Sequence, residues 1–322
     1  MPRSLYRYIW RISGRAQAGL AALSIVVFLL DLAPLELQRR IVNDALQQQE
    51  IAPLLWLAAL YAGVALAQGG SKLALNIWRS KVSEAANRRL RLDTYAVAVR
   101  HPAKGAEAGK EGLGLSIILA EVEPVGGFIG TGVSDPVLHA GVLLSVFGYM
   151  IYLQPWMALV GAALFVPQFV FVPLLQEAIN RRTERRIQIL RNLSVEIVNE
   201  TADRVPGQSE NEFERRVNNV YRLNMEIFRR KFSMNFLMNL LHHLGIGGIL
   251  LVGGWFVLRH RIEVGTVVAF ISGLNRINDP WGDLVNFFRD LTNARVKYQL
   301  IACVLDEAAV TDAPDPIAAN SG

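Results

Sequence analysis

The sequence predicts an all-α integral membrane protein with six long transmembrane helices and helical extensions into the cytoplasm. Two observations lead to this class. Six apolar segments each reach about the 20 residues that a helix needs to cross the hydrocarbon core, and two long arginine-rich intervals divide these segments into three pairs. The composition agrees, because hydrophobic residues make up 52% of the chain and charged residues only 19%, against about 25% in soluble domains.

The six apolar segments define the expected spans. In chain order they are Ala18–Leu37, Ile51–Trp78, Val125–Leu153, Trp156–Leu175, Phe232–Leu258 and Val264–Phe288. Several exceed the minimal length, so we expect these helices to run on beyond the bilayer. The first segment does not read as a cleaved signal peptide, because Asp31, Pro34 and Glu36 interrupt it and no small-residue cleavage pattern follows.

The distribution of basic residues predicts the orientation. Four arginines and no acidic residue precede the first span, the interval Arg79–Pro124 holds eight basic residues, and Gln176–Lys231 holds twelve. By the positive-inside rule, both termini and both intervals lie in the cytoplasm of a multi-pass protein in the plasma (inner) membrane. Since the basic residues stand where a topology signal would place them, the pI near 9.5 does not indicate nucleic-acid binding.

Both long intervals are expected to be helical. Apolar residues recur with a period close to 3.6 in Ser80–Val99 and in Asn180–Asn199, and each run continues a span without a strong breaker. Breakers follow at His101–Gly105 and at Arg204–Gly207. Each interval is therefore predicted to be a helix that leaves the membrane, a short turn, and a returning helix.

This order of features resembles the transmembrane domain of ABC exporters of the six-span type. The most specific stretch is Leu250–Gly273, which contains Gly-Gly-Trp, a polar turn of Arg-His-Arg, and then Val-Gly-Thr-Val-Val-Ala-Phe. Ala294–Glu307 is similar to the stretch that leads to the family's nucleotide-binding domain. The resemblance covers residues 5–307. It implies a domain-swapped dimer, in which the fourth and fifth spans cross to the opposite protomer.

The resemblance also implies that the two cytoplasmic turns carry short coupling helices that dock into ATPase subunits. The candidate residues are Ala103, Lys104, Gly105 and Glu107 in the first turn, and Val205, Pro206, Gly207 and Gln208 in the second. The alternative interpretation is that both turns are only solvated connections.

No ATP-binding loop is recognisable in the sequence. Gly105–Glu111 is only superficially similar to Gly-x-x-x-x-Gly-Lys-Ser/Thr, because its glycines are one residue too close and a carboxylate replaces the hydroxyl that would bind magnesium. We therefore expect no catalytic residue and no bound cofactor in this chain, with ATP and Mg²⁺ acting through a separate nucleotide-binding ATPase subunit.

Two other motifs have structural interpretations. The glycines of Gly126–Gly132 are expected to let helices approach closely rather than to bind a dinucleotide. His242 and His243 are adjacent, so on a helix their side chains point about 100° apart and do not readily share a metal ion. No metal site is predicted.

Ionisable and amide residues at membrane depth are candidates for lining a translocation cavity, because they are costly in lipid. These residues are Asp31, Asn275, Arg276, Asn278, Asp279 and Asp283. The alternative is that Arg276 pairs with Asp279 along one helix and only stabilises the bundle.

The predicted function is that of a permease subunit of an ATP-driven exporter, working as a homodimer or as a heterodimer with a similar chain. Residues 1–17 are expected to be a cytoplasmic segment, 18–307 the transmembrane domain and 308–322 a disordered tail. Two alternatives remain open: a membrane scaffold or sensor that keeps the fold without a motor, and a gene product truncated before its own ATPase domain. The substrate cannot be read from the sequence.

Overall fold

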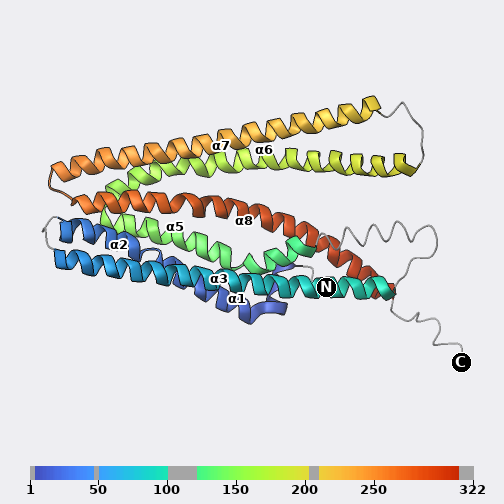
Figure 1. Ribbon diagram of the computed structural model, residues 1–322, viewed down its shortest axis with the longest axis horizontal. Coiled ribbons are helices and arrows are strands. Elements are labelled where there is room, and N and C mark those ends of the chain that lie inside the picture. Colours follow the sequence, from blue (N-terminus) through green and yellow to red (C-terminus); the bar gives the residue numbers. More distant parts are fainter. Residues whose placement is uncertain (1–3, 47–50, 101–121, 203–209, 312–322) are drawn as a thin grey trace. The chain divides into compact units, whose positions relative to one another are not determined.

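The computed structural model describes residues 4–46, 51–100, 122–202 and 210–311, and all regular structure within these ranges is helical (Figure 1). The helices are α1 (Leu5–Leu30), α2 (Ala33–Arg40), the short π-helical segment η1 (Ile41–Leu46), α3 (Ile51–Arg100), α5 (Ser134–Leu153), α6 (Pro155–Ala202), α7 (Glu210–Leu258) and α8 (Val264–Thr311). A further helical segment covers residues 122–131. The chain divides into two compact units, the first comprising Met1–Leu153 and Glu263–Gly322, and the second Gln154–Ile262.

Five helices among the described residues are long and apolar enough to cross a membrane. They are Leu5–Asp44, Ile51–Ala96, Ser134–Leu153, Pro155–Leu190 and Phe213–Leu258. This agrees with the first five predicted spans and makes the chain a multi-pass membrane protein. The predicted sixth span is also helical, as the first half of α8, but its asparagines and charged residues reduce its apolar character, so its place in the membrane stays a prediction.

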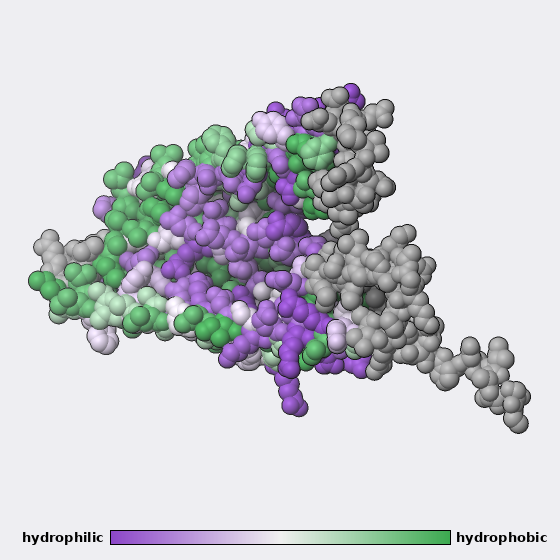
Figure 2. Space-filling view, turned by 45° about the vertical axis from the view of Figure 1, so that its right-hand side comes forward, coloured by the Kyte–Doolittle hydropathy of each residue, from purple (hydrophilic) through white to green (hydrophobic). Residues whose placement is uncertain are grey.

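The predicted helical extensions are present. α3 runs without interruption from Ile51 to Arg100, and α6 runs from Pro155 to Ala202. The predicted breakers themselves lie outside the described residues. α7 then begins at Glu210. Figure 2 shows hydrophobic side chains gathered toward one end of the visible surface and hydrophilic ones over its middle, in keeping with the change from apolar to charged residues along these long helices.

The first predicted span consists of two helices with a break between them, at the place where Asp31, Pro34 and Glu36 interrupt the apolar run. α1 ends at Leu30, Asp31 and Leu32 form a turn, and α2 begins at Ala33. The physical cause is Pro34, which has no backbone N–H to donate to the preceding turn. The backbone instead closes tighter bonds, from the Leu32 amide to the Leu29 carbonyl at 3.2 Å and from the Leu35 amide to the Leu32 carbonyl at 3.0 Å.

The third predicted span is also interrupted, at Gly132 and Val133, between the helical segment 122–131 and α5. Pro136 lies in the first turn of α5 and cannot donate to the carbonyl of Gly132. The Tyr6 hydroxyl of α1 donates to that carbonyl instead, at 3.4 Å. A side chain from another helix thus stabilises the break.

Close helix contacts build the interior of the first unit. The Gln17 side chain is fully buried and donates to the carbonyl of Ile129 at 2.7 Å, which joins α1 to the segment 122–131. On the same segment, a Cβ added to Gly130 would lie 2.6 Å from the backbone oxygen of Arg79 on α3. The prediction that this glycine lets two helices approach closely is confirmed, whereas a Cβ at Gly127 would meet nothing within 4 Å.

The second unit is an antiparallel hairpin of α6 and α7 (Figure 1). In its charged part, Arg182 Nε donates to Glu226 Oε2 at 2.8 Å, and Arg186 Nη1 donates to Asn224 Oδ1 at 3.2 Å. These bonds join residues that are 44 and 38 positions apart in the sequence. They align the two helices in the interval that the sequence predicts to be a helical hairpin.

Candidate functional site

A buried carboxylate lies at the break in the first span and collects partners from two other helices. Asp31 is only 5% exposed. Its Oδ1 accepts a hydrogen bond from Arg276 Nη1 of α8 at 3.1 Å and lies 3.6 Å from Lys72 Nζ of α3. Gln68, one turn before Lys72, donates to the same oxygen. Three helices of the first unit thus meet at one negative charge.

The local fold explains why the carboxylate is placed there. Asp31 stands at the end of α1 and two residues before the start of α2, because Pro34 breaks the helix. The positive end of the α2 dipole favours an anion at this place. A charge at membrane depth is costly unless it is paired, and the two cations supply that pairing.

A second set of polar contacts joins α3 and α8 to α5. Arg79 Nη1 lies 2.9 Å from Asp135 Oδ1, and Arg79 Nε donates to Ser134 Oγ at 2.8 Å. One turn along α5, His139 Nδ1 lies 3.6 Å from Asp283 Oδ2 of α8. α3, α5 and α8 are therefore linked by charged and polar groups as well as by packing.

The two sets follow common helix faces. Residues seven apart are two helical turns apart, about 10 Å, on nearly the same face. This spacing relates Lys72 to Arg79 on α3 and Arg276 to Asp283 on α8. We call the whole group the polar column; its members are Asp31, Gln68, Lys72, Arg79, Ser134, Asp135, His139, Arg276 and Asp283. Its acidic and basic members face one another, so the column holds ion pairs inside the first unit.

A separate polar face of α8 is exposed. It is formed by Asn275, Asp279, Asp283 and Asn286, which are all exposed and fall within one side of the helix at spacings of three and four. We call this face the polar stripe; Asp283 belongs to it and, through His139, to the polar column. Phe288, two residues after Asn286, is 62% exposed on the opposite side of α8. The helix therefore has a polar side and an apolar side at the same level.

A third polar group joins the end of the first span to α5 and to the start of α8. Glu36 accepts two hydrogen bonds from Arg39, each 2.9 Å long, and one from Tyr149 Oη of α5 at 2.6 Å. Asn43 donates to Glu263 and accepts from the Gly265 amide at 2.7 Å. A Cβ at Gly265 would clash with the Arg39 carbonyl and the Asn43 side chain. This group fixes the beginning of α8 against η1.

Comparison with known families decides the identity of the fold. The model of the ABC transporter transmembrane region matches residues 21–201, which is more than half of the chain. The chain belongs to the ABC transporter transmembrane region family. The match covers most of the first predicted span and all of the next three, and it ends before Leu250–Gly273, the stretch in which the sequence resemblance is most specific. The α7 and α8 helices of this ABC transmembrane chain follow in the expected order.

The structure separates the predicted cavity residues of this ABC transmembrane chain. It brings Asp31 and Arg276 together, although they are 245 positions apart. Asn275, Asp279 and Asp283 are on the exposed stripe, and Asn278 is half-buried. The alternative expectation is that Arg276 pairs with Asp279, which lies on the same helix. In the structure, the contact described for Arg276 is with Asp31 instead. The candidate coupling residues of both turns are outside the described residues.

Sequence reasoning missed several members of the polar column in this ABC transmembrane chain. Gln68 and Lys72 lie within the second apolar segment, and His139 lies within the third. Each is a polar residue within an apolar segment. This break in the apolar pattern is the sequence feature that could have identified them. From the sequence, Arg79 counts only among the basic residues that predict the orientation in the membrane. In the structure its side chain contacts Ser134 and Asp135.

Proposed function

We propose that this chain is the membrane-spanning permease subunit of an ATP-driven exporter. In this proposal it lies in the plasma (inner) membrane with both termini in the cytoplasm. A separate nucleotide-binding ATPase subunit binds ATP and Mg²⁺, and its closure moves the long helices as rigid levers. The two predicted turns, which would contain Lys104 and Pro206, are the proposed docking points for that ATPase.

The observation that carries the proposal is the polar stripe on α8. Asparagine and aspartate side chains are unfavourable against lipid, so an exposed row of them in a transmembrane helix faces water or protein. In a member of the ABC transporter transmembrane region family, an aqueous translocation cavity meets that requirement. The polar column lies next to it through Asp283, so a change in its ion pairs would alter the wall of the cavity.

A dimer completes the proposed pathway. α6 and α7 form a compact unit of their own, which is compatible with a pair of spans that packs against a second protomer. On α7, Cβ atoms at Gly247 and Gly254 would meet nothing within 4 Å. Small residues with open space above them are typical of places where transmembrane helices approach closely. The second protomer is either the same chain or a similar one.

Cysteine accessibility tests the cavity. Cys303 is the only cysteine of the sequence, so single cysteines can be placed at Asp279 and Asn286 in a Cys303→Ala background. The matched control is Phe288→Cys, on the opposite side of α8 at nearly the same depth. We expect a membrane-impermeant maleimide to label positions 279 and 286, with a rate that changes when ATP and the ATPase subunit are present, and to leave position 288 unlabelled.

The outcomes separate transport from the alternatives. Labelling of positions 279 and 286 that responds to ATP supports a gated pathway. Protection of both positions under every condition contradicts a transport pathway and favours a scaffold that has kept the fold. Equal labelling at position 288 would show that α8 lies outside the membrane, which contradicts its assignment as a cavity-lining span.

A further inference from the structure

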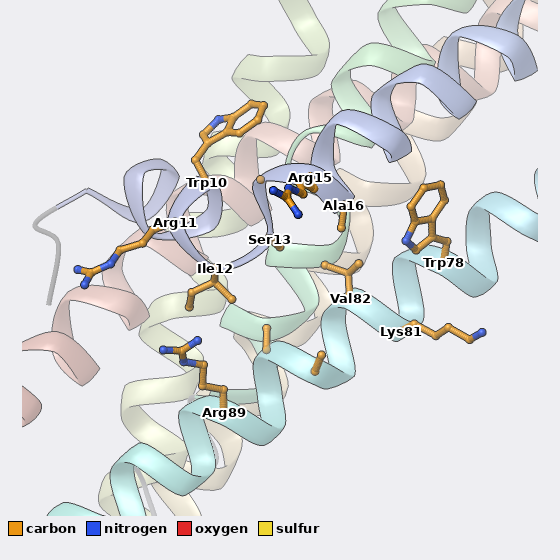
Figure 3. Close-up of a pocket in the computed structure, with 13 residues that line it drawn as sticks. Trp10, Arg11, Ile12, Ser13, Arg15, Ala16, Trp78, Lys81, Val82 and Arg89 are labelled. Atoms are coloured by element: carbon orange, nitrogen blue, oxygen red, sulfur yellow. The ribbon is translucent and has the colours of Figure 1, made fainter.

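A pocket of about 840 Å³ lies between α1 and α3 (Figure 3). Its lining comes from Trp10 to Ala16 on α1 and from Trp78 to Arg89 on α3, so it lies entirely within the first unit. Four of the described lining residues are cationic and none is acidic. The cations are Arg11, Arg15, Lys81 and Arg89.

A local break in α1 makes room for the pocket. Ser13 has non-helical backbone angles (φ −135°, ψ 24°), and its hydroxyl donates to the carbonyl of Ile9 at 3.0 Å. The first turns of α1, before Ser13, therefore run in a different direction from the rest of the helix. Gly19 shapes the wall of the pocket, because a Cβ there would clash with the Trp78 ring. The absence of a side chain lets that ring lie directly against α1.

The pocket is at a boundary between apolar and basic sequence in both helices. On α1, Arg7, Arg11 and Arg15 precede the apolar run, and on α3 the apolar run ends at Trp78 and is followed by Arg79 and Lys81. Tryptophan is enriched where the hydrocarbon core meets the headgroups. Trp10 is 52% exposed and Trp78 is 37% exposed, so both are available to a ligand at that level.

The cations differ in direction. Figure 3 shows Arg89 extending from α3 toward α1, whereas Lys81 and Arg11 point outward from the two helices. Arg15 lies just after the break, beside Ser13. Arg15 and Arg89 line the pocket from opposite helices, so an anion that enters between α1 and α3 has a cation on each side, with the other two cations at the rim.

We propose that this pocket binds the phosphate headgroup of an anionic phospholipid from the membrane leaflet on the arginine-rich side. Basic pockets between transmembrane helices at the headgroup level favour such lipids, because each nearby cation attracts the anionic group in a medium of low dielectric constant. Arg15 and Arg89 hold the phosphate and Trp78 packs on the glycerol region. The acyl chains run along the apolar part of α3 that precedes Trp78. This binding does not depend on transport or on an ATPase.

The test measures lipid binding to the full purified chain in detergent by native mass spectrometry. Phosphatidylglycerol and phosphatidylcholine with identical acyl chains are titrated in parallel, and inorganic phosphate is titrated separately. We expect tighter retention of phosphatidylglycerol. The double substitution Arg15→Gln and Arg89→Gln should weaken its binding about tenfold or more. Arg15→Lys with Arg89→Lys, which keeps both charges, should restore most of the binding.

A matched control removes the same charge elsewhere. Arg185→Gln with Arg229→Gln replaces two exposed arginines of the second unit and should leave phosphatidylglycerol binding unchanged. If the control weakens binding as much as the pocket variant does, the attraction is a general effect of net charge and the proposal fails. It also fails if the two lipids bind equally, or if inorganic phosphate binds as tightly and with the same dependence on Arg15 and Arg89.

A second measurement needs no substitution in the cation pair. Brominated phosphatidylglycerol should quench the tryptophan fluorescence of the unmodified protein more strongly than brominated phosphatidylcholine does, because Trp10 and Trp78 line the pocket. Trp78→Phe should remove a large share of the difference between the two lipids. Equal quenching by both lipids would contradict the assignment, even if the arginine variants do not fold.

Discussion

Single charged side chains inside the first unit are stabilised by partners from other helices. Asp31 and Arg276 illustrate this, because each would be unfavourable at membrane depth without the other. Lys72 is nearly half exposed, with 48% of its side chain accessible, so its interaction with Asp31 is more screened than that of Arg276, whose side chain is 26% accessible. Arg276 is therefore the main partner of the buried carboxylate.

Arg276→Gln should destabilise the protein by roughly 1–3 kcal/mol, because it leaves the buried Asp31 carboxylate with a weaker set of partners. Thermal unfolding in detergent, followed by circular dichroism, measures this. Adding Asp31→Asn to Arg276→Gln should recover part of the loss, since both charges are then removed. Arg289→Gln is the control, because Arg289 is exposed on α8 next to Asp290. An equal loss in the control would contradict the special role of Arg276.

At the scale of helices, breaks and close approaches arrange the polar groups. The turn at Asp31 and Leu32 ends α1, and the turn at Gly132 and Val133 separates the segment 122–131 from α5. In both cases a proline follows within a few residues, and it has no backbone N–H to donate to the preceding helical turn. Each break places a polar residue, Asp31 or Ser134, where cations from α3 reach it.

Gly130→Ala should destabilise the contact between α3 and the segment 122–131 by about 1–3 kcal/mol, because the added Cβ would lie 2.6 Å from the Arg79 carbonyl oxygen. The matched control is Gly127→Ala, whose Cβ meets nothing within 4 Å. A loss of stability measured by thermal unfolding should appear only in the first variant, because alanine has the higher helix propensity and an unobstructed Gly→Ala change does not destabilise a helix. Similar losses in both variants would contradict the role of the close approach.

At the scale of the whole molecule, the division into two units bears on assembly. α6 and α7 contact each other along their length within the second unit, and α7 carries Gly254 with open space beside it. We propose that this chain functions as a dimer. The surface around Gly254 is therefore a candidate contact with the second protomer. A bulky side chain there would interfere with assembly and not with the fold of one chain.

Gly254→Leu should therefore lower the dimer fraction, measured by size-exclusion chromatography with light scattering in a mild detergent, while the helix content of the chain stays the same. Leu251→Ala, one turn away and 76% exposed, provides a nearby substitution that removes bulk. A dimer fraction unaffected by Gly254→Leu would place the protomer contact elsewhere on the chain.

The ATPase partner is tested by extracting the chain gently from its native membrane and identifying co-purifying proteins by mass spectrometry. We expect a protein with a phosphate-binding Gly-Lys-Ser/Thr loop and ATPase activity in the complex. Pro206→Ala with Gly207→Ala in the second turn should reduce its recovery. Isolation of the chain without any ATPase would contradict the transporter assignment and favour the scaffold.

The class of this protein and the helical course of its chain follow from local features of the sequence. Hydropathy and the 3.6-residue period are local properties, so the first five spans and the extensions to Arg100 and Ala202 were readable without a structure. Only the tertiary structure decided that Arg276 pairs with Asp31, that Arg79 turns to Asp135, and that the pocket opens between α1 and α3. The reason is that these contacts depend on how each helix is rotated and on where prolines interrupt it, and residues 245 positions apart carry no local signal of their meeting.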